Sequence, residues 1–261
     1  MNYWSELSIQ LANQRNYLDE LYTVYPLAPD VVRDINQTTW NNVESAFKKR
    51  DNTGLIKNLL KLKLFPIKDS YIAYLRKDKT AIERNPETVN RLCGRLYDMG
   101  LEKIWARSTE PKETNRQIGP LFKRWLGKKT LGLDFLRPLA FTGTDTNALL
   151  DGSDAELMSF ARMHLNYDGT KGLDFVARMH GKYVVGEAKF LTDFGGHQNA
   201  QFEDAKTLLK NSSVEAIKVA ILDGVLFING KSKMHQFVTK HTEQYNIFSS
   251  LLLREFLYSI N

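Results

Sequence analysis

The stretch that decides the fold is KGLDFVARMHGKYVVGEAK, which covers residues 171–189. Apolar and polar residues alternate through its second half, which predicts a β-strand with Glu187 and Lys189 on one face. The apolar run around Asp174 predicts the preceding strand, and the short link Met179–Lys182 predicts a hairpin between the two. We therefore expect Asp174 to meet Glu187 at one end of a sheet, with Lys189 one pleat further along.

Two carboxylates and one ammonium group on rigid strands suit metal-assisted chemistry on a phosphodiester. Oxygen atoms of Asp and Glu are the ligands that a hard divalent ion such as Mg²⁺ prefers. Such an ion polarises the phosphodiester, lowers the pKa of a bound water and neutralises the charge that builds up in the transition state. Lys189 is expected to lie beside the attacking water or the scissile phosphate as a fixed positive charge.

These residues resemble the PD-(D/E)xK nuclease superfamily, and more closely its type II restriction endonucleases. Asp174 matches the first acid and Glu187-Ala188-Lys189 match the ExK element, while Leu173 stands where the name of the motif has proline. The resemblance implies that Asp174 and Glu187 bind Mg²⁺, that the Ala188 carbonyl adds a ligand, and that Lys189 orients or activates water. The alternative is a pair of surface strands with solvated charges. The apolar runs around both acids, and a glycine shortly before each, favour the catalytic interpretation.

Composition limits the other functions that the chain can have. A formal net charge of +6 in 261 residues is compatible with a nucleic-acid partner. Cys93 is the single cysteine, so an intrachain disulfide is excluded, as is usual in a reducing compartment. The sequence has no run of eighteen apolar residues and opens on no signal peptide, so we expect no membrane partner and a soluble, cytoplasmic protein of a prokaryote.

Positive charge gathers just ahead of the proposed catalytic strands. Residues 112–129 hold six lysines and arginines against one acid. A basic helix here could lie along phosphates, with Arg116 and Gln117 able to reach base edges. An ordinary solvated helix face over a core contact explains the same residues equally well. The DNA-binding candidates of this region are Arg116, Gln117 and Lys123, and Lys171 joins them at the start of the hairpin.

A further candidate segment follows the ExK strand. The Gly195-Gly196 pair predicts a tight turn into a helix, whose first turn carries amide side chains that can pair with adenine. The amide residues are Gln198, Asn199 and Gln201. This segment could read the DNA sequence or order the active-site water, and the alternative is a surface helix cap. In the superfamily a helix ahead of the first catalytic strand often carries a further Glu near the metal. Glu156 is the candidate, and complementing the helix dipole is its alternative role.

The first hundred or so residues are predicted to be helical, and the best-marked helix runs from Asn85 to Gly100. With residues 101–105 it could form half of a helix-turn-helix that places Arg91 and Arg95 on DNA, or a plain helical hairpin. Near the carboxyl end, residues 214–222 and 225–228 are predicted strands. Residues 245–258 form a strongly apolar helix that is either deeply buried or a dimer contact.

The predicted fold is α/β, with a mixed central β-sheet flanked by helices, as in a restriction-endonuclease-like core. Residues 1–110 are expected to form a helical N-terminal region and residues 111–261 the catalytic domain. We expect a type II site-specific deoxyribonuclease that hydrolyses double-stranded DNA with Mg²⁺ as cofactor. A homodimer would match two-fold symmetric sites, and a cognate DNA methyltransferase is the expected functional partner. The alternatives are a structure-specific repair or junction nuclease and a non-catalytic helix-turn-helix regulator.

Overall fold

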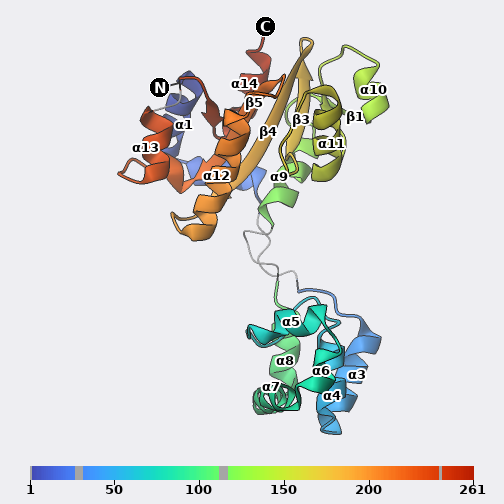
Figure 1. The fold of residues 1–261 in the computed structure, drawn as a ribbon. Coiled ribbons are helices and arrows are strands. Elements are labelled where there is room, and N and C mark those ends of the chain that lie inside the picture. Colours follow the sequence, from blue (N-terminus) through green and yellow to red (C-terminus); the bar gives the residue numbers. More distant parts are fainter. Residues whose placement is uncertain (1, 27–31, 112–116, 241–242) are drawn as a thin grey trace. The chain divides into compact units, whose positions relative to one another are not determined.

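The chain divides into two compact units, which Figure 1 draws and which are described here one at a time. The computed structural model describes residues 2–26, 32–111, 117–240 and 243–261. One unit joins residues 1–27 to residues 114–261, and the other comprises residues 28–113. This division differs from the expected one, in which residues 1–110 form one helical region. Side chains of Tyr17, Leu21, Val24 and Tyr25 are buried in one core with residues of the sheet.

The sheet unit holds every strand that the structure describes. Its elements in chain order are α1 (Tyr3–Ala12), α2 (Tyr17–Val24), α9 (Ile118–Gly127), β1 (Asp134–Leu136), α10 (Pro138–Thr142), β2 (Ala148–Leu150), α11 (Asp154–His164), β3 (Phe175–Met179), β4 (Lys182–Leu191), α12 (Gly196–Lys210), β5 (Ile217–Gly224), η2 (Val225–Phe227), α13 (Lys233–Lys240), β6 (Asn246–Phe248), η3 (Ser250–Leu252) and α14 (Leu253–Tyr258). The strands follow one another in the sheet in the order β1-β2-β3-β4-β5-β6. The pairs β1–β2, β4–β5 and β5–β6 are parallel, and β2–β3 and β3–β4 are antiparallel. The prediction of a mixed central sheet is confirmed.

Helices cover both faces of this sheet (Figure 1). Side chains of α2, α9 and α14 form one core with Phe175, Ala188 and Val219. On the opposite face, α11, α12 and α13 pack over Val185 and Ala220. Strands that are buried on both faces give near-continuous apolar runs in the sequence, and β3 and β5 have this pattern. The result is a three-layer α/β unit whose strand ends support the site described below.

The helical unit has a core of its own. Its elements are α3 (Gln37–Lys48), α4 (Asn52–Leu59), α5 (Tyr71–Lys77), α6 (Ala81–Arg84), α7 (Pro86–Met99) and α8 (Leu101–Ser108). Buried leucine, isoleucine and valine side chains of these helices form one cluster around Cys93. Only Gly100 separates α7 from α8, whereas a helix-turn-helix uses a turn of three or four residues. This connection is therefore too short for the turn of a helix-turn-helix. Across the residues described in both units, no helix is long and apolar enough to span a bilayer.

Two local predictions differ from the structure. Residues 225–227 form the short helix η2 because the strand ends at Gly224, whose φ is 98° and where an added Cβ would lie 2.1 Å from the Leu191 carbonyl oxygen. The predicted helix over residues 245–258 begins as strand β6 and becomes helical only from Ser250 onward, in η3 and α14. Its apolar side chains are buried within this chain, which is the first of the two predicted alternatives. Elsewhere in the sheet unit, Arg178 of β3 binds the carbonyl oxygen of Phe141 in α10 and that of Thr146, which lies between α10 and β2.

Candidate active site

The β3–β4 hairpin positions the predicted catalytic residues. His180 and Gly181 form its two-residue turn with φ of 49° and 76°, the left-handed pair that type I′ hairpin turns require. Phe175 pairs with Gly186, and the Asp174 N–H donates to the Gly186 carbonyl oxygen at 3.0 Å. This register sets Asp174 opposite Glu187, on the face of the sheet that α11 and α12 cover.

Asp174, Glu187 and Lys189 meet at one point. The Lys189 Nζ lies 2.6 Å from the Asp174 Oδ2 and 2.6 Å from the Glu187 Oε2. The backbone N–H of Ala188 also donates to the Asp174 Oδ2, at 2.8 Å. The three side chains are only 15%, 6% and 20% exposed, respectively. The structure thus brings together the three residues that the sequence singles out, in a mostly buried cluster with one net negative charge when all are ionised.

Burial and mutual charge control the protonation of this cluster. Burial, and then the Asp174 carboxylate, raise the pKa of Glu187 to about 8. Burial alone would lower the pKa of Lys189, but the charges and hydrogen bonds of the two carboxylates outweigh it and raise that pKa above its ordinary value. Two neighbouring buried carboxylates therefore need a cation between them, and the Lys189 ammonium supplies one.

The oxygen atoms of this cluster fit a hard divalent ion. The Asp174 Oδ2 and the Glu187 Oε2 each lie 2.6 Å from the Lys189 Nζ, so the two carboxylates are close enough to each other to bind one cation together. Mg²⁺ keeps several of its waters and commonly needs only one or two carboxylates from the protein. The described residues include no group of three or more His, Cys, Asp and Glu side chains arranged around one ion position, so water and the backbone would complete the coordination. Ala188, between the two predicted ligands, is the backbone candidate.

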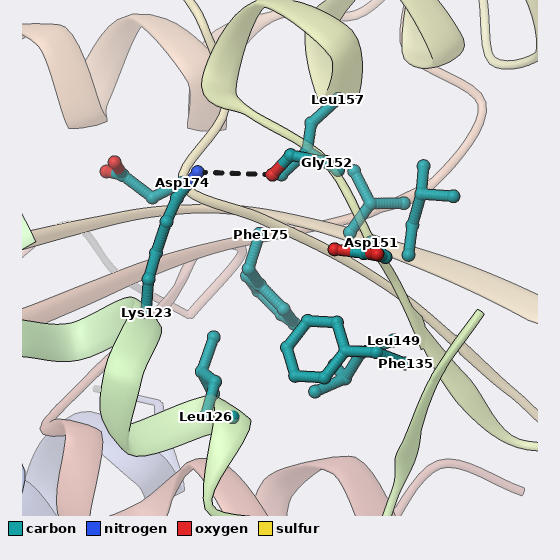
Figure 2. A pocket seen from close by; sticks show the side chains of 12 residues that line it. Lys123, Leu126, Phe135, Leu149, Asp151, Gly152, Leu157, Asp174 and Phe175 are labelled. Atoms are coloured by element: carbon teal, nitrogen blue, oxygen red, sulfur yellow. Dashed lines mark hydrogen bonds between the residues drawn. The ribbon is translucent and has the colours of Figure 1, made fainter. Parts of the chain in front are cut away.

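Hollows flank the cluster on two sides. Asp174 lines a pocket of about 320 Å³ with Lys123, Asp151 and Phe175, as Figure 2 shows. Glu187 lines a second, smaller pocket of about 100 Å³ together with Lys171 and other residues of the α12 side. A substrate group can therefore approach the cluster through the pocket that Asp174 lines. Lysine stands at the rim of both openings.

The two rim lysines are held by ion pairs. Lys123 lies 2.5 Å from the Asp154 carboxylate, and its Nζ also donates to the Gly152 carbonyl oxygen at 3.4 Å (Figure 2). Lys171 lies 2.5 Å from the Asp204 carboxylate. Both side chains keep partial exposure, so a phosphate could compete for each ammonium. Both lysines thus lie in pockets next to the Asp174–Glu187–Lys189 cluster, and their role as DNA contacts stays a prediction.

The amide residues at the start of α12 differ from one another. Gln198 is buried, and its amide bonds to the Thr192 hydroxyl at 3.1 Å and backbone N–H at 3.4 Å, so it fixes the loop after β4 and offers no free edge to a base. Asn199 is exposed and donates to the Phe194 carbonyl oxygen at 3.1 Å. Gln201 lies 3.3 Å from the ring of His197. Asn199 and Gln201 thus remain the candidates on this helix.

Three further predicted residues need separate treatment. Arg116 lies outside the described residues. Gln117 immediately precedes α9, and its carbonyl oxygen accepts the N–H of Leu121. Glu156 closes a capping box: its Oε2 accepts the Ser153 N–H at 2.7 Å, and this bond lowers its pKa. The helix-capping role therefore accounts for Glu156.

A residue that the sequence analysis missed lies at the same end of the sheet. Asp151 follows β2 directly and lines the pocket of Asp174, where Arg137 binds it at 3.1 Å. Its only sequence signal is a position at the end of an apolar run, which identifies a strand end but no partner. The pocket beside Asp174 thus carries a second carboxylate, already paired with a cation.

A mixed sheet that brings an Asp before β3 together with a Glu and a Lys of the neighbouring strand β4, beside an open pocket, defines a restriction-endonuclease-like nuclease core. Residues 2–260 match the family model described as Tsp45I type II restriction enzyme, and the chain belongs to that family. It is therefore a site-specific deoxyribonuclease, and the predicted enzyme class and DNA substrate are confirmed. No curated protein and no solved structure matches the chain.

Proposed function

We propose that the chain hydrolyses phosphodiester bonds of double-stranded DNA at a short specific sequence, with Mg²⁺ as cofactor and the Asp174–Glu187–Lys189 cluster as its catalytic centre. The observation that carries the proposal is the convergence of both carboxylates on the Lys189 ammonium at 2.6 Å each. Burying two acids and one lysine costs desolvation free energy, which an ordinary surface hairpin avoids by keeping its charges in water.

Each residue has a distinct role in this proposal. Asp174 and Glu187 would hold the ion, with the Ala188 carbonyl as a third protein ligand. When bound, Mg²⁺ supplies polarisation of the phosphodiester and a more acidic bound water. Lys189 keeps a positive charge beside the reacting phosphate or orients the attacking water, and its raised pKa keeps it protonated during this work. Asp174 anchors the arrangement through the Ala188 N–H bond.

The substrate contacts follow from the surroundings of the cluster. Lys123 and Lys171, at the two rims, would bind phosphates on either side of the scissile bond. Asn199 and Gln201, at the start of α12, are the candidates for contacts to base edges. A homodimer would place two such sites on the two strands of a symmetric recognition sequence. A methyltransferase that protects the same sequence would accompany the enzyme in its cell.

Cleavage of phage DNA with Mg²⁺ or with EDTA tests the proposal directly. We expect discrete fragments with Mg²⁺ and intact DNA with EDTA, and sequenced fragment ends should share one short motif. Glu187→Gln and Lys189→Ala should each slow cleavage by about 10²-fold or more, as expected for loss of a group that acts in the transition state.

Lys182→Ala is the matched control, because Lys182 is an exposed lysine of the same strand. Its cleavage rate should equal that of the unaltered protein. Cutting by Lys189→Ala at the unaltered rate would remove Lys189 from the catalytic centre. Cleavage of branched DNA alone, with linear phage DNA left intact, would favour a structure-specific nuclease.

A further inference from the structure

Almost all of the net positive charge of the chain belongs to the helical unit. Residues 28–113 contain 17 lysines and arginines against 12 aspartates and glutamates, a net of +5, whereas the rest of the chain has a net of +1. The proposed catalytic centre is in the other unit. A unit that carries no catalytic residue but most of the excess positive charge is suited to binding a polyanion.

One face of this unit combines basic side chains with exposed aromatic rings. We call it the α5–α7 face and define it by Lys68, Tyr71, Tyr74, Arg91 and Arg95. Tyr71 and Tyr74 are each 60% exposed. They lie one helical turn apart on α5, where Ile72 and Leu75 form the buried side. The apolar requirement of the core is thus met by other residues, and the two tyrosines are left for an external contact.

Asp69 organises the arginines of this face. Arg91 donates to both carboxylate oxygens of Asp69, at 2.8 and 3.4 Å, and Arg95 donates to one of them at 3.3 Å. The Asp69 side chain is only 10% exposed, so it forms the base on which the two guanidinium groups rest. The Arg91 guanidinium also lies 5.4 Å from the centre of the Tyr71 ring. These contacts fix two long side chains that would otherwise lose conformational entropy on binding a ligand.

The charge balance of the face remains positive. Each guanidinium has five N–H donors, so one carboxylate cannot occupy the donors of both. Arg91 and Arg95 thus bring two cations to the single Asp69 carboxylate, and Lys68, which precedes Asp69 in the chain, is exposed. The pocket of about 320 Å³ between α3 and α8 has the opposite character, because Glu44 and Glu102 line it and would repel phosphate. Within the helical unit, the charges therefore favour the α5–α7 face for a polyanion.

We infer that the α5–α7 face is a second DNA-binding surface, on which Arg91 and Arg95 contact phosphates or guanine edges and the two tyrosine hydroxyls bond phosphates. The inference rests on the proposed function for the nature of its ligand, double-stranded DNA. Arg side chains oriented by a carboxylate present the planar fork that phosphate and guanine both accept. Asp69 thereby acts as a positioning residue for the two arginines.

The test measures binding of the full chain to linear plasmid DNA in EDTA over a range of salt concentrations. Arg91→Ala combined with Arg95→Ala should weaken binding about tenfold or more. It should also lower the slope of log Kd against log salt by about 1.8, the value for two lost phosphate contacts. The matched control, Lys48→Ala with Lys49→Ala, removes two exposed charges at the end of α3 and should change Kd less than about threefold.

Two further readouts separate the possible outcomes. Arg91→Lys with Arg95→Lys keeps the charges and should keep the salt slope, and its thermal unfolding checks that the unit still folds. Binding is measured without divalent metal and also in the Glu187→Gln background. The binding result therefore does not depend on whether the proposed cleavage chemistry is correct. Unchanged binding by the Arg→Ala pair, or an equal loss in the control pair, would overturn the inference.

Discussion

At the scale of the residue, one buried carboxylate connects distant segments of the sheet unit. Asp223, near the end of β5, is fully buried and pairs in register with Phe190, next to Lys189 on β4. Its carboxylate accepts the Tyr25 hydroxyl at 2.8 Å, the Ser249 hydroxyl at 2.6 Å and the Ser250 N–H at 3.1 Å. Although these bonds lower its pKa, burial raises it more. Asp223 therefore joins Tyr25, directly after α2, to Ser249 and Ser250, directly after β6. Its partner in the sheet, Phe190, follows Lys189 of the proposed catalytic cluster.

We predict that Tyr25→Phe destabilises the protein, because it removes a donor from a buried carboxylate without changing the volume of the core. The expected loss is about 1.5–3 kcal/mol in the free energy of unfolding, the usual value for a hydrogen bond to a charged group. Urea unfolding measures it. Tyr22→Phe is the control, since Tyr22 is an exposed tyrosine of α2, the helix that ends directly before Tyr25, and its change should stay within about 0.5 kcal/mol. Equal unfolding curves for both variants would contradict a structural role for the Tyr25–Asp223 bond.

At the scale of elements, close packing explains why a glycine stands shortly before each of the two proposed catalytic acids. A Cβ added at Gly186 would lie 2.3 Å from the Phe175 ring, which crosses this position from the paired strand. A Cβ added at Gly172 would lie 2.6 Å from the Asp154 Cβ, where α11 begins. Both glycines thus allow close approach of a neighbour at the points where the two acids are positioned.

We predict that Gly186→Ala disturbs β4 next to Glu187. The added methyl group must displace the Phe175 ring or Val219, and overpacking of this kind costs about 1–3 kcal/mol in the free energy of unfolding. Cleavage should slow as well, because Glu187 follows directly in the strand. Gly119→Ala in α9 meets no atom within 4 Å and should be neutral or slightly stabilising. Thermal unfolding and cleavage rates of the two variants should therefore differ, and identical behaviour would disprove the packing role of Gly186.

Elements that depend on local signals could be predicted from the sequence. The β3–β4 hairpin was predictable because alternation and a two-residue turn lie within one short segment, and the Asp174–Glu187–Lys189 cluster follows from its register. The helix α7 was predictable from Asn85, Pro86 and Gly100 for the same reason. The strand β6 was not predictable, because only the neighbouring β5 and its parallel pairing turn this apolar segment into a strand.

At the scale of the whole molecule, the contacts that could not be predicted from the sequence join residues that lie far apart in the chain. The Ser5 hydroxyl donates to the Ile247 carbonyl oxygen, 242 residues away, and contacts of this kind make the first helices part of the sheet unit. The pairing of Asp69 with Arg91 and Arg95 likewise joins two helical segments whose charges show no pattern along the chain. Sequence reasoning located the strands of the proposed catalytic centre but could not assign residues 1–27 to the same unit.

The single cysteine gives a test of the helical unit within the whole protein. Cys93 is fully buried in the core of that unit, and burial, with a smaller effect of the Asp51 charge, raises the pKa of its thiol to about 12. At pH 8 the thiolate should therefore be about a thousandfold rarer than in the unfolded chain, where the pKa is about 8.5. We predict that a disulfide reagent such as dithionitrobenzoate labels the native protein at least that much more slowly than the urea-unfolded protein, as followed by absorbance.

The pH dependence of this labelling shows which state reacts. If the helical unit must open before the reagent can enter, the rate should follow the thiol of the open state and level off above about pH 8.5. A thiol that reacted inside the folded core would keep gaining about tenfold per pH unit toward pH 12, because its thiolate fraction would still be rising. We expect levelling, since no part of Cys93 is exposed. Rapid labelling in buffer at the rate seen in urea would instead mean that residues 28–113 lack the closed core on which the arrangement of the α5–α7 face depends.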